Sequence, residues 1–482
     1  MSSEMKALSY INGKWISEHC EPAAVFNPYT AEQIGTQYVA TEELAEEAIE
    51  AAFQAKKSIA AIPAHKRAAI LKQAALTLKA EKEGFAQLIS RELGKPLKNT
   101  RDEVDRSIET LELSGEEAKR LFGETLPGDA SKRGTDSIAM TFKVPVGVIG
   151  AITPFNAPLN LICHKIGPAF AAGNTVVLKP APQTPLIAAE LLKLLHRSGF
   201  PEQAIQMVLG GVEIGRQIVK DHRVNLISFT GSVKGGDNIA RTAGMKKVLL
   251  ELGGNGSTIV HHDADLKRAA VLCAKTGYSN SGQSCISVQR IYVHEQVVSE
   301  FVGLLKDEVT NVRIGDPLSI ESDVGCLVDR EAAKRVEAWI KEAADLGAEI
   351  VCGGERRGAT IVPAVLLSPP KQAKVVCEEV FGPVVSIIPY RDIDEAVKET
   401  NDSPYGLQAG LFTNQFDLVQ KLVRDLEVGG VVLNGTSNFR LDHWPYGGIK
   451  NSGIGREGPR FAAEEMTETK MVVIQQLTKS LS

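Results

Sequence analysis

One cysteine and one glutamate stand in sequence contexts that suit covalent catalysis. Cys285 follows a Gly-Gln-Ser turn and precedes an alternating apolar run, and Glu251 lies upstream, between an apolar run and a Gly-Gly pair. A thiolate is a strong nucleophile towards a carbonyl carbon, and a carboxylate can activate the water that cleaves the resulting thioester. A buried core cysteine and a surface glutamate are the structural alternatives. The pairing indicates a thiol enzyme with its own general base.

Composition sets the frame for this chemistry. The chain has 482 residues, 43% of them hydrophobic, and a net charge of −5, which is typical of a globular protein of two or three domains and argues against a nucleic-acid partner. Its seven cysteines are scattered without a CxxC pair, so we expect neither a metal site nor a disulfide framework. The N-terminus has no apolar signal core, and prolines break the most apolar stretch, residues 144–162. We therefore expect a cytoplasmic protein with no membrane partner.

The elements that must position these residues alternate between strands and helices. Asn12-Gly13 predicts a hairpin turn, and a helical region begins after the cap residue Thr41 and runs to about residue 122. Short β-branched runs separated by helical stretches then predict two parallel sheets covered on both faces. The strand-like runs are 146–152, 174–180, 204–210, 226–231 and 247–254 in the first set, and 290–295, 362–367, 384–390, 409–413 and 431–434 in the second.

A glycine-rich turn indicates where a nucleotide could bind. Gly231, Ser232 and Gly236 lie between a strand-like run and a helical run. Main-chain N–H groups and a hydroxyl at a helix N-terminus can hold a pyrophosphate. The chain has no GxGxxG motif, and turns of this kind are common, so the motif is weak by itself.

The order of these motifs resembles the NAD(P)-dependent aldehyde dehydrogenase superfamily, in its hydrolytic, non-acylating branch, over nearly the whole chain. The resemblance implies an α/β fold of two Rossmann-like doubly wound domains plus a small oligomerisation β-sheet. It places the cofactor-binding domain at residues 1–122 and 144–253, the catalytic domain at 254–450, and the oligomerisation segments at 123–143 and 465–482. It also implies a homodimer or homotetramer.

The resemblance assigns catalytic roles to four residues. Cys285 is the nucleophile that forms a thiohemiacetal and then a thioester, and Glu251 activates water. Asn156 and the main-chain N–H of Cys285 form the oxyanion hole, and Lys165 matches a position in the proton-relay region. The alternatives for the last two side chains are a turn asparagine between prolines and a solvated lysine.

The resemblance also implies NAD or NADP as the cofactor. Lys179 would reach the adenosine ribose, Glu379 would hold the nicotinamide ribose and Phe381 would flank the ring, while Gly231, Ser232 and Gly236 form the dinucleotide turn. Members that prefer NAD often carry a glutamate shortly after the lysine, where this chain has Pro182. That difference removes a barrier to NADP without attracting it, so the sequence leaves the preference open.

The segment 434–458 resembles the substrate-tunnel loop of the family and carries Arg440 and His443. Arg106 and His164 fall on helices near the same tunnel. Two arginines in one pocket suit an anionic group on the aldehyde. Ion pairs with Asp105 or Asp442 are the alternative.

We therefore expect a small anionic or hydroxylated aldehyde as the substrate. Non-phosphorylating glyceraldehyde-3-phosphate dehydrogenases and phosphonoacetaldehyde dehydrogenases look similar, although they often carry an arginine where this chain has Ser284. His164 replaces an arginine of succinate-semialdehyde dehydrogenases and disfavours that assignment. A broad or lactaldehyde-type enzyme stays open. Glu251 argues against a coenzyme A-acylating relative, and the intact set of catalytic residues argues against a non-catalytic one.

Overall fold

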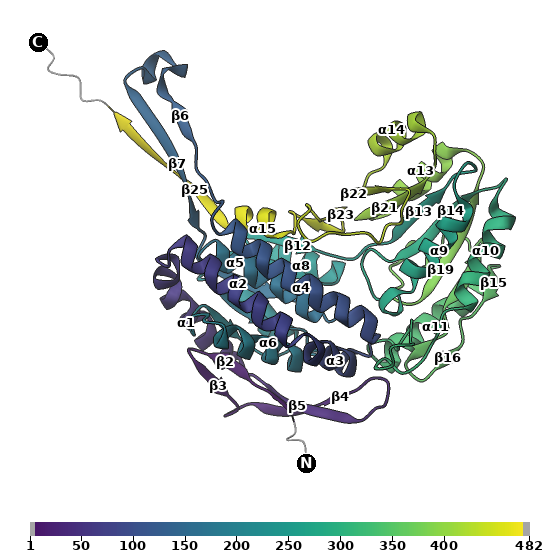
Figure 1. Ribbon diagram of the computed structural model, residues 1–482, viewed down its shortest axis with the longest axis horizontal. Helices are drawn as coiled ribbons and strands as arrows, with labels where there is room; N and C mark the ends of the chain where they lie inside the picture. The colour runs from purple at the N-terminus through teal and green to yellow at the C-terminus, as the bar shows by residue number, and fades with distance from the viewer. Residues whose placement is uncertain (1–4, 476–482) are drawn as a thin grey trace, which may run out of the picture.

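The computed structural model describes residues 5–475, and its architecture is organised by two large, mainly parallel sheets, one in each of two lobes (Figure 1). The first sheet has the strand order β24-β12-β11-β8-β9-β10-β2-β3. Its parallel centre consists of β8 (Val148–Ile152), β9 (Thr175–Lys179), β10 (Ile205–Met207), β11 (Leu226–Thr230) and β12 (Lys247–Glu251). The strand order reverses between β8 and β11, which makes that point the expected nucleotide crevice.

Alternating side chains of the first sheet feed two separate cores. Ile149 and Ala151 of β8 pack with one set of helices, whereas Val148 and Ile152 pack with the other. The first face is covered by α2 (Ala64–Ala80), α3 (Lys82–Leu93), α4 (Leu97–Glu117), α5 (Pro158–Ala171) and α6 (Pro185–Arg197), and the second by α1 (Glu42–Ala60), α7 (Val212–Lys220) and α8 (Val233–Thr242). The sequence pattern of a sheet buried on both faces is thus confirmed.

Two local signals near the N-terminus are also confirmed. β2 (Ser9–Ile11) and β3 (Lys14–Ile16) form the antiparallel hairpin predicted from Asn12-Gly13. The Thr41 side chain accepts a hydrogen bond from the Leu44 N–H at the start of α1. A second small sheet in this region, β1 (Met5–Ala7), β5 (Gln33–Val39) and β4 (Glu21–Phe26), was not predicted.

The second sheet has the order β15-β18-β19-β14-β13-β21-β22, and all of its neighbours are parallel except β15 with β18. Its strands are β13 (Gly256–Val260), β14 (Val288–His294), β15 (Glu349–Cys352), β18 (Ala364–Leu367), β19 (Val384–Tyr390), β21 (Gln408–Phe412) and β22 (Gly430–Leu433). The helices of this lobe include α9 (Leu266–Gly277), α10 (Val298–Thr310), α11 (Arg330–Asp345), α13 (Ile393–Asn401) and α14 (Phe416–Asp425). Two mainly parallel sheets, one in each lobe, agree with the two doubly wound α/β domains that the resemblance implied.

The two segments without a partner in either sheet pair with each other. β6 (Thr125–Pro127), β7 (Ser137–Pro145) and β25 (Thr467–Gln475) form an antiparallel arm that projects from the first lobe (Figure 1). The arm therefore extends two residues beyond the predicted limit at 143, and residues 476–482 of the predicted segment 465–482 lie outside the described residues, as do residues 1–4 of the predicted first domain. Within residues 5–475, no helix combines the length and hydropathy needed to cross a membrane.

Candidate active site

The connection from the first sheet to the second passes directly beside Cys285. Glu251 is the last residue of β12, and Gly253 and Gly254 lead from it to β13. A Cβ atom on Gly254 would lie 2.1 Å from the Cys285 carbonyl oxygen, and one on Gly253 would lie 2.6 Å from the Glu379 carboxylate. The Gly254 N–H donates to Glu379 Oε1 at 2.9 Å. Glycine is required at both positions because three functional segments meet there.

Cys285 lies in the turn between α9 and β14. The preceding short helix, Ser279–Gly282, contains two non-glycine residues at positive φ, Asn280 at 51° and Ser281 at 55°. The Cys285 thiol is partly exposed, and its Sγ lies 3.0 Å from the hydroxyl oxygen of Tyr446. Burial raises the pKa of Cys285 to about 12, and the hydrogen bond with Tyr446 acts in the opposite direction.

Glu251 is buried at the end of β12 with little to stabilise its charge. Its Oε2 atom has no hydrogen-bond partner within the described part of the chain. Burial raises the pKa of Glu251 well above its usual value, and the neighbouring charge of Glu457 raises it further. A carboxylate with a raised pKa is suited to take up a proton from water near neutral pH.

Asn156 is held against the turn that carries Cys285. Its side-chain Nδ2 donates to the Gln283 carbonyl at 3.0 Å. Its own carbonyl accepts from Lys95 Nζ at 3.2 Å and from Asn280 Nδ2 at 3.1 Å. The structure thus brings Asn156 next to the Cys285 segment.

A buried ion pair that was not predicted from the sequence supports the Asn156 segment. Lys95 and Glu103 lie 2.6 Å apart, and Glu103 also accepts from the Leu159 N–H at 2.8 Å. The pair therefore fixes the loop that follows β8 to the start of α4. The only available signal was the presence of opposite charges eight positions apart within the predicted helical region.

Lys165 is buried in α5, so the alternative of a solvated lysine is wrong. Its Nζ donates to the Ser228 hydroxyl at 3.1 Å and lies 3.8 Å from Glu457 Oε2. Burial lowers the pKa of Lys165, and the charges of Glu457 and Glu251 oppose that effect. A small cavity is lined by Lys165, Ser228, Leu249, Glu251, Arg456, Glu457 and Ala462, so both carboxylates and the amine share one space.

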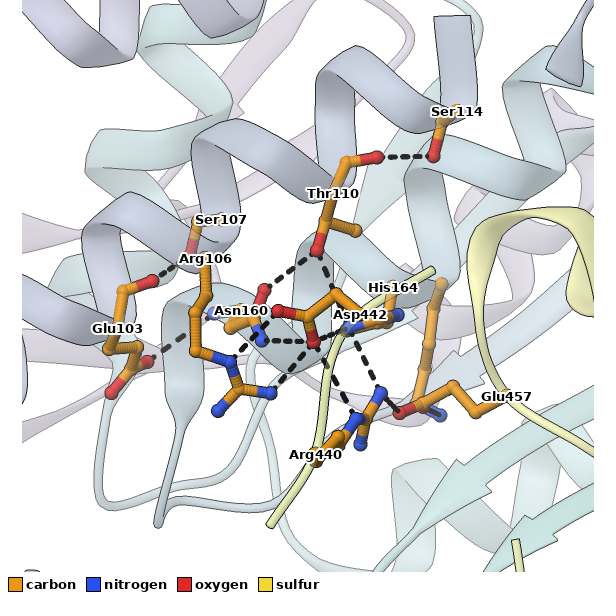
Figure 2. Close-up of polar contacts among 11 residues, drawn as sticks. Glu103, Arg106, Ser107, Thr110, Ser114, Asn160, His164, Arg440, Asp442 and Glu457 are labelled. Atoms are coloured by element: carbon orange, nitrogen blue, oxygen red, sulfur yellow. Dashed lines mark hydrogen bonds and ion pairs between the residues drawn. The ribbon is translucent and has the colours of Figure 1, made fainter. Parts of the chain in front are cut away.

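Both tunnel arginines belong to a buried network centred on Asp442 (Figure 2). Arg106 binds Asp442 through two hydrogen bonds, of 2.9 Å from Nε and 2.7 Å from Nη2. His164 Nε2 lies 2.8 Å from the same carboxylate, and Arg440 Nε lies 3.5 Å from it. Although burial opposes ionisation, His164 and Arg106 hold the pKa of Asp442 well below its usual range. The ion pair between Arg106 and Asp442 is the alternative that the sequence left open, and Asp105 instead pairs with Lys82.

Arg440 connects this network to Glu457 and to Tyr446, the residue beside Cys285. Its Nη2 donates to Glu457 Oε1 at 2.7 Å and lies 3.0 Å from His164 Nε2. Its guanidinium stacks over the Tyr446 ring, with the central carbon 4.0 Å from the ring centroid. Tyr446 and Glu457 were not among the predicted site residues, although both lie in the segment recognised as the tunnel loop. His443, which was, is exposed and packs against Trp444 rather than in the network.

The residues expected to bind the cofactor lie at the carboxyl ends of β9 and β11. Lys179 is buried, donates to the Pro180 carbonyl at 3.2 Å, and has its pKa lowered to about 8 by burial. Ser232 caps α8 by accepting from the Gly235 N–H at 3.2 Å, and a Cβ on Gly236 would lie 2.4 Å from Leu252. The close packing of α8 on the sheet and the buried amine of Lys179 at the end of β9 fit a bound dinucleotide.

Glu379 and Phe381 lie just before β19 in the second lobe, and Glu379 contacts the connection between the two sheets at Gly254. Burial raises the pKa of Glu379 to about 7, while its hydrogen bond from Gly254 opposes the shift. Phe381 has a positive φ of 48° and packs edge-on against Phe155, with ring centroids 5.8 Å apart. An aromatic pair near a carboxylate that reaches the Gly253-Gly254 connection fits a nicotinamide riboside.

Comparison with known proteins agrees with this geometry. The model of the aldehyde dehydrogenase family matches residues 15–472. A 3-sulfolactaldehyde dehydrogenase of Priestia megaterium is 45% identical over 96% of this chain and 97% of its own length, and a lactaldehyde dehydrogenase of Methanococcus maripaludis is 42% identical over 97% and 100%.

Solved structures are equally similar. Glyceraldehyde-3-phosphate dehydrogenase GapN from Methanocaldococcus jannaschii, complexed with NADP, has a TM-score of 0.92 and 38% identity, covering 95% of this chain and all of that one. Aldehyde dehydrogenase 21 from Physcomitrella patens, in complex with the reaction product succinate, has a TM-score of 0.95 and 37% identity, covering 99% and 100%.

Proposed function

The chain belongs to the aldehyde dehydrogenase family, and on that premise we propose that it oxidises a short 2-hydroxyaldehyde to its carboxylic acid, with 3-sulfolactaldehyde as the first candidate. The broader activity, NAD(P)-dependent oxidation of a small hydroxylated or anionic aldehyde, agrees with the family match and with the names of the relatives. Lactaldehyde and 3-sulfolactaldehyde share the hydroxyl group next to the aldehyde and differ in the group at the far end.

The proposed reaction begins at Cys285. Its thiolate adds to the aldehyde carbon, and Asn156 together with the Cys285 N–H stabilises the oxyanion that forms. A nicotinamide cofactor, which Lys179, Glu379 and Phe381 would hold, would supply the acceptor for the hydride, and loss of that hydride would convert the adduct into a thioester on Cys285. Glu251 then takes a proton from water, which attacks the thioester and releases the carboxylic acid. The raised pKa of Glu251 supports this role, because its carboxylate is basic enough to accept the proton.

The observation that carries the substrate proposal is the position of Arg106. Its side chain is 39% exposed, and its Nη1 group takes no part in the two hydrogen bonds to Asp442. A guanidinium with a free N–H group at the edge of the tunnel suits a sulfonate or another anionic tail. Arg440 contacts the same carboxylate, Asp442, and stacks on Tyr446, which hydrogen-bonds to the Cys285 thiol. A chain of contacts therefore connects Arg106 to the thiol.

One observation favours lactaldehyde as the second candidate. Asp442 already neutralises Arg106 and Glu457 already neutralises Arg440, so the cluster carries no uncompensated cation. A neutral hydroxyaldehyde could bind such a pocket through hydrogen bonds alone. The two candidates therefore differ in how strongly the tail is recognised.

A matched set of aldehydes tests the proposal. Propanal, lactaldehyde and 3-sulfolactaldehyde add the hydroxyl and then the sulfonate in steps, and succinate semialdehyde supplies an anion without the hydroxyl. We expect kcat/KM to rise at least tenfold with the hydroxyl, about 1.4 kcal/mol of transition-state discrimination, and again with the sulfonate. Equal values for propanal and lactaldehyde would overturn the hydroxyaldehyde proposal. Equal values for lactaldehyde and 3-sulfolactaldehyde would favour the second candidate.

The cofactor preference is measured in the same assay. Pro182 accepts a hydrogen bond from Gln37 Nε2 at 3.2 Å and brings no carboxylate to the ribose position. This supports the use of both NAD and NADP, since nothing at that position repels a 2′-phosphate. Each aldehyde is therefore assayed with both cofactors at saturation.

The exposed apolar residues of the arm support a homodimer or homotetramer. Met471, Val472, Val473 and Ile474 of β25 are exposed, as are Ile138 and Phe142 of β7. An apolar antiparallel edge of this kind is typical of an interface between copies. Light scattering of the whole chain measures the subunit number, and a monomer would contradict the proposal.

A reducing compartment, the cytoplasm, is supported by the seven free cysteines, one of which must remain a thiol to react.

A further inference from the structure

Tyr446 is the only residue whose side chain hydrogen-bonds to the Cys285 thiol among the described residues. Its hydroxyl oxygen lies 3.0 Å from Sγ. The ring is buried and packs with Ile286, Leu407 and Cys285 in a small cluster of its own. A phenol can donate or accept a hydrogen bond, whereas a thiolate can only accept one.

Tyr446 is held in this position from its main chain. Its N–H donates to the Glu457 carbonyl at 3.0 Å, and the Glu457 N–H donates to the Tyr446 carbonyl at 2.6 Å. The next residue, Gly447, passes so close to the general base that a Cβ there would lie 2.9 Å from Glu251 Oε1. The segment therefore contacts both Cys285 and Glu251, and a side chain at position 447 would crowd Glu251.

The Tyr446 ring is held by a second, electrostatic connection. Glu457 binds Arg440 at 2.7 Å, and Arg440 stacks on the ring at 4.0 Å. A cation over the ring makes the phenol a stronger donor, because it stabilises electron density that moves onto the ring. The main chain and the side chain of Glu457 thus both orient Tyr446 towards Cys285.

We propose that the Tyr446 hydroxyl donates a hydrogen bond to the Cys285 thiolate and is therefore a catalytic residue of the reaction, with Arg440 and Glu457 as its positioning residues. The proposal rests on the proposed role of Cys285 as the nucleophile. The environment of Cys285 makes such a donor necessary. Burial is the largest cause that raises the pKa of the thiol, to about 12 overall, and the carboxylates of Glu379 and Glu251 act in the same direction. Tyr446 and Arg440 are the two groups that oppose them.

The test measures the thiol directly rather than turnover. The whole protein without cofactor is treated with iodoacetamide from pH 6 to pH 10, and the modified Cys285 peptide is quantified by mass spectrometry. Tyr446→Phe removes the hydroxyl and keeps the ring that packs. We expect the Cys285 profile to move up by about one pH unit and alkylation at pH 7 to slow about tenfold.

Two controls accompany the measurement. Tyr390→Phe removes another buried tyrosine hydroxyl, which lies 2.8 Å from His261 Nδ1 in the second lobe, and should leave the Cys285 profile unchanged. The exposed Cys377 reports the intrinsic reagent rate in every sample. A Tyr446→Phe profile that superimposes on that of the wild type, at an unchanged melting temperature, would overturn the proposal. The same shift in Tyr390→Phe would overturn it as well.

A kinetic arm separates this role from a structural one. In Tyr446→Phe, kcat/KM for the best aldehyde should fall about tenfold at pH 7 and recover towards the wild-type value as pH rises, because the thiolate then forms without help. A loss that is the same at every pH would contradict the proposal. Since alkylation involves neither aldehyde nor cofactor, an error in the proposed substrate changes the kinetic arm and leaves the alkylation result intact.

Discussion

Glu251 and Glu457 are two buried carboxylates that line the same small cavity, yet their pKa values are shifted in opposite directions. Burial raises the pKa of both groups. Glu251 has one oxygen without a partner, and its pKa is raised well above the usual value. Glu457 has Arg440 at 2.7 Å and Lys165 at 3.8 Å, and its pKa is lowered to about 2. Depth in the protein is the same for both, so the partners decide the charge.

This difference in pKa agrees with the different roles proposed for Glu251 and Glu457. A general base has to change its protonation state during each turnover, whereas a group that orients other side chains must keep a constant charge. Glu457 supplies the constant charge that fixes Arg440 and Lys165, and Glu251 is left to titrate. Exchanging the partners would exchange the roles.

Removing the nucleophile should have the largest effect, because the titration of Glu251 serves only a reaction at Cys285. Cys285→Ala should abolish NAD(P)H formation from every aldehyde while cofactor binding, measured by fluorescence, is retained. Cys377→Ala, which removes an exposed thiol, is the matched control and should keep full activity. Residual turnover of Cys285→Ala near the wild-type rate would exclude Cys285 as the nucleophile.

Removing the titrating carboxylate should stop only the second half of the reaction. Glu251→Gln should slow steady-state turnover by about 10²–10⁴-fold and leave a single burst of NAD(P)H, which stopped-flow absorbance detects. In the wild type, the rate of thioester hydrolysis should rise with pH through the raised pKa of Glu251, because the base acts in its ionised form. A pH-independent hydrolysis rate, or a Glu251→Gln variant without rate loss, would assign the base role elsewhere.

Breaking the constant-charge partner should instead cost stability. Glu457→Gln removes the closer of the two ion-pair partners of the buried Arg440, and we expect a loss of about 3–5 kcal/mol in the free energy of unfolding. Since the folded-state pKa of Glu457 is lowered from 4.5 to about 2, its contribution is full above pH 4.5 and is lost as pH falls towards 2. Urea unfolding at pH 7 and pH 3.5 should therefore show a larger difference between variant and wild type at pH 7. Equal differences at both pH values would contradict the assignment of charge.

The half-exposed arginine should show the smallest effect, confined to substrate choice. Arg106→Met should raise KM for 3-sulfolactaldehyde about tenfold and change KM for propanal little. Arg120→Met removes an arginine that pairs with Glu116 and Glu117 on the surface, and it should change stability by less than about 1 kcal/mol and leave both KM values unchanged. An equal rise in KM for both aldehydes in Arg106→Met would make Arg106 a scaffold for Asp442 and nothing more.

The fold was predictable because its signals are local. A β-branched run such as residues 174–180 and a cap such as Thr41 depend only on their neighbours in sequence, and the order of the strands then follows from short right-handed connections. The small sheet of β1, β4 and β5 was missed because its strands lie largely at the surface and show little alternation of apolar and polar residues to set them apart from loops.

The site was predictable only where a motif carried the information. Cys285 and Glu251 stand in recognisable contexts, but the contact between Tyr446 and Cys285 joins positions 161 residues apart, and the pair of Arg106 with Asp442 joins positions 336 apart. No local pattern encodes such contacts. The sequence therefore indicated arginines near the tunnel without showing that each already has a carboxylate partner.

The edge strand β24 (Gly453–Ile454) has a consequence for how the protein is made. It pairs with Leu250 and Glu251 of β12, which leave the ribosome some two hundred residues earlier. During synthesis the nascent chain therefore carries the Cys285 thiol long before it carries the segment that closes the sheet and brings in Glu457. The thiol gains its hydrogen-bonding tyrosine and its base gains its final surroundings only when translation is nearly complete. A chain released early would have the nucleophile but not the machinery that activates it.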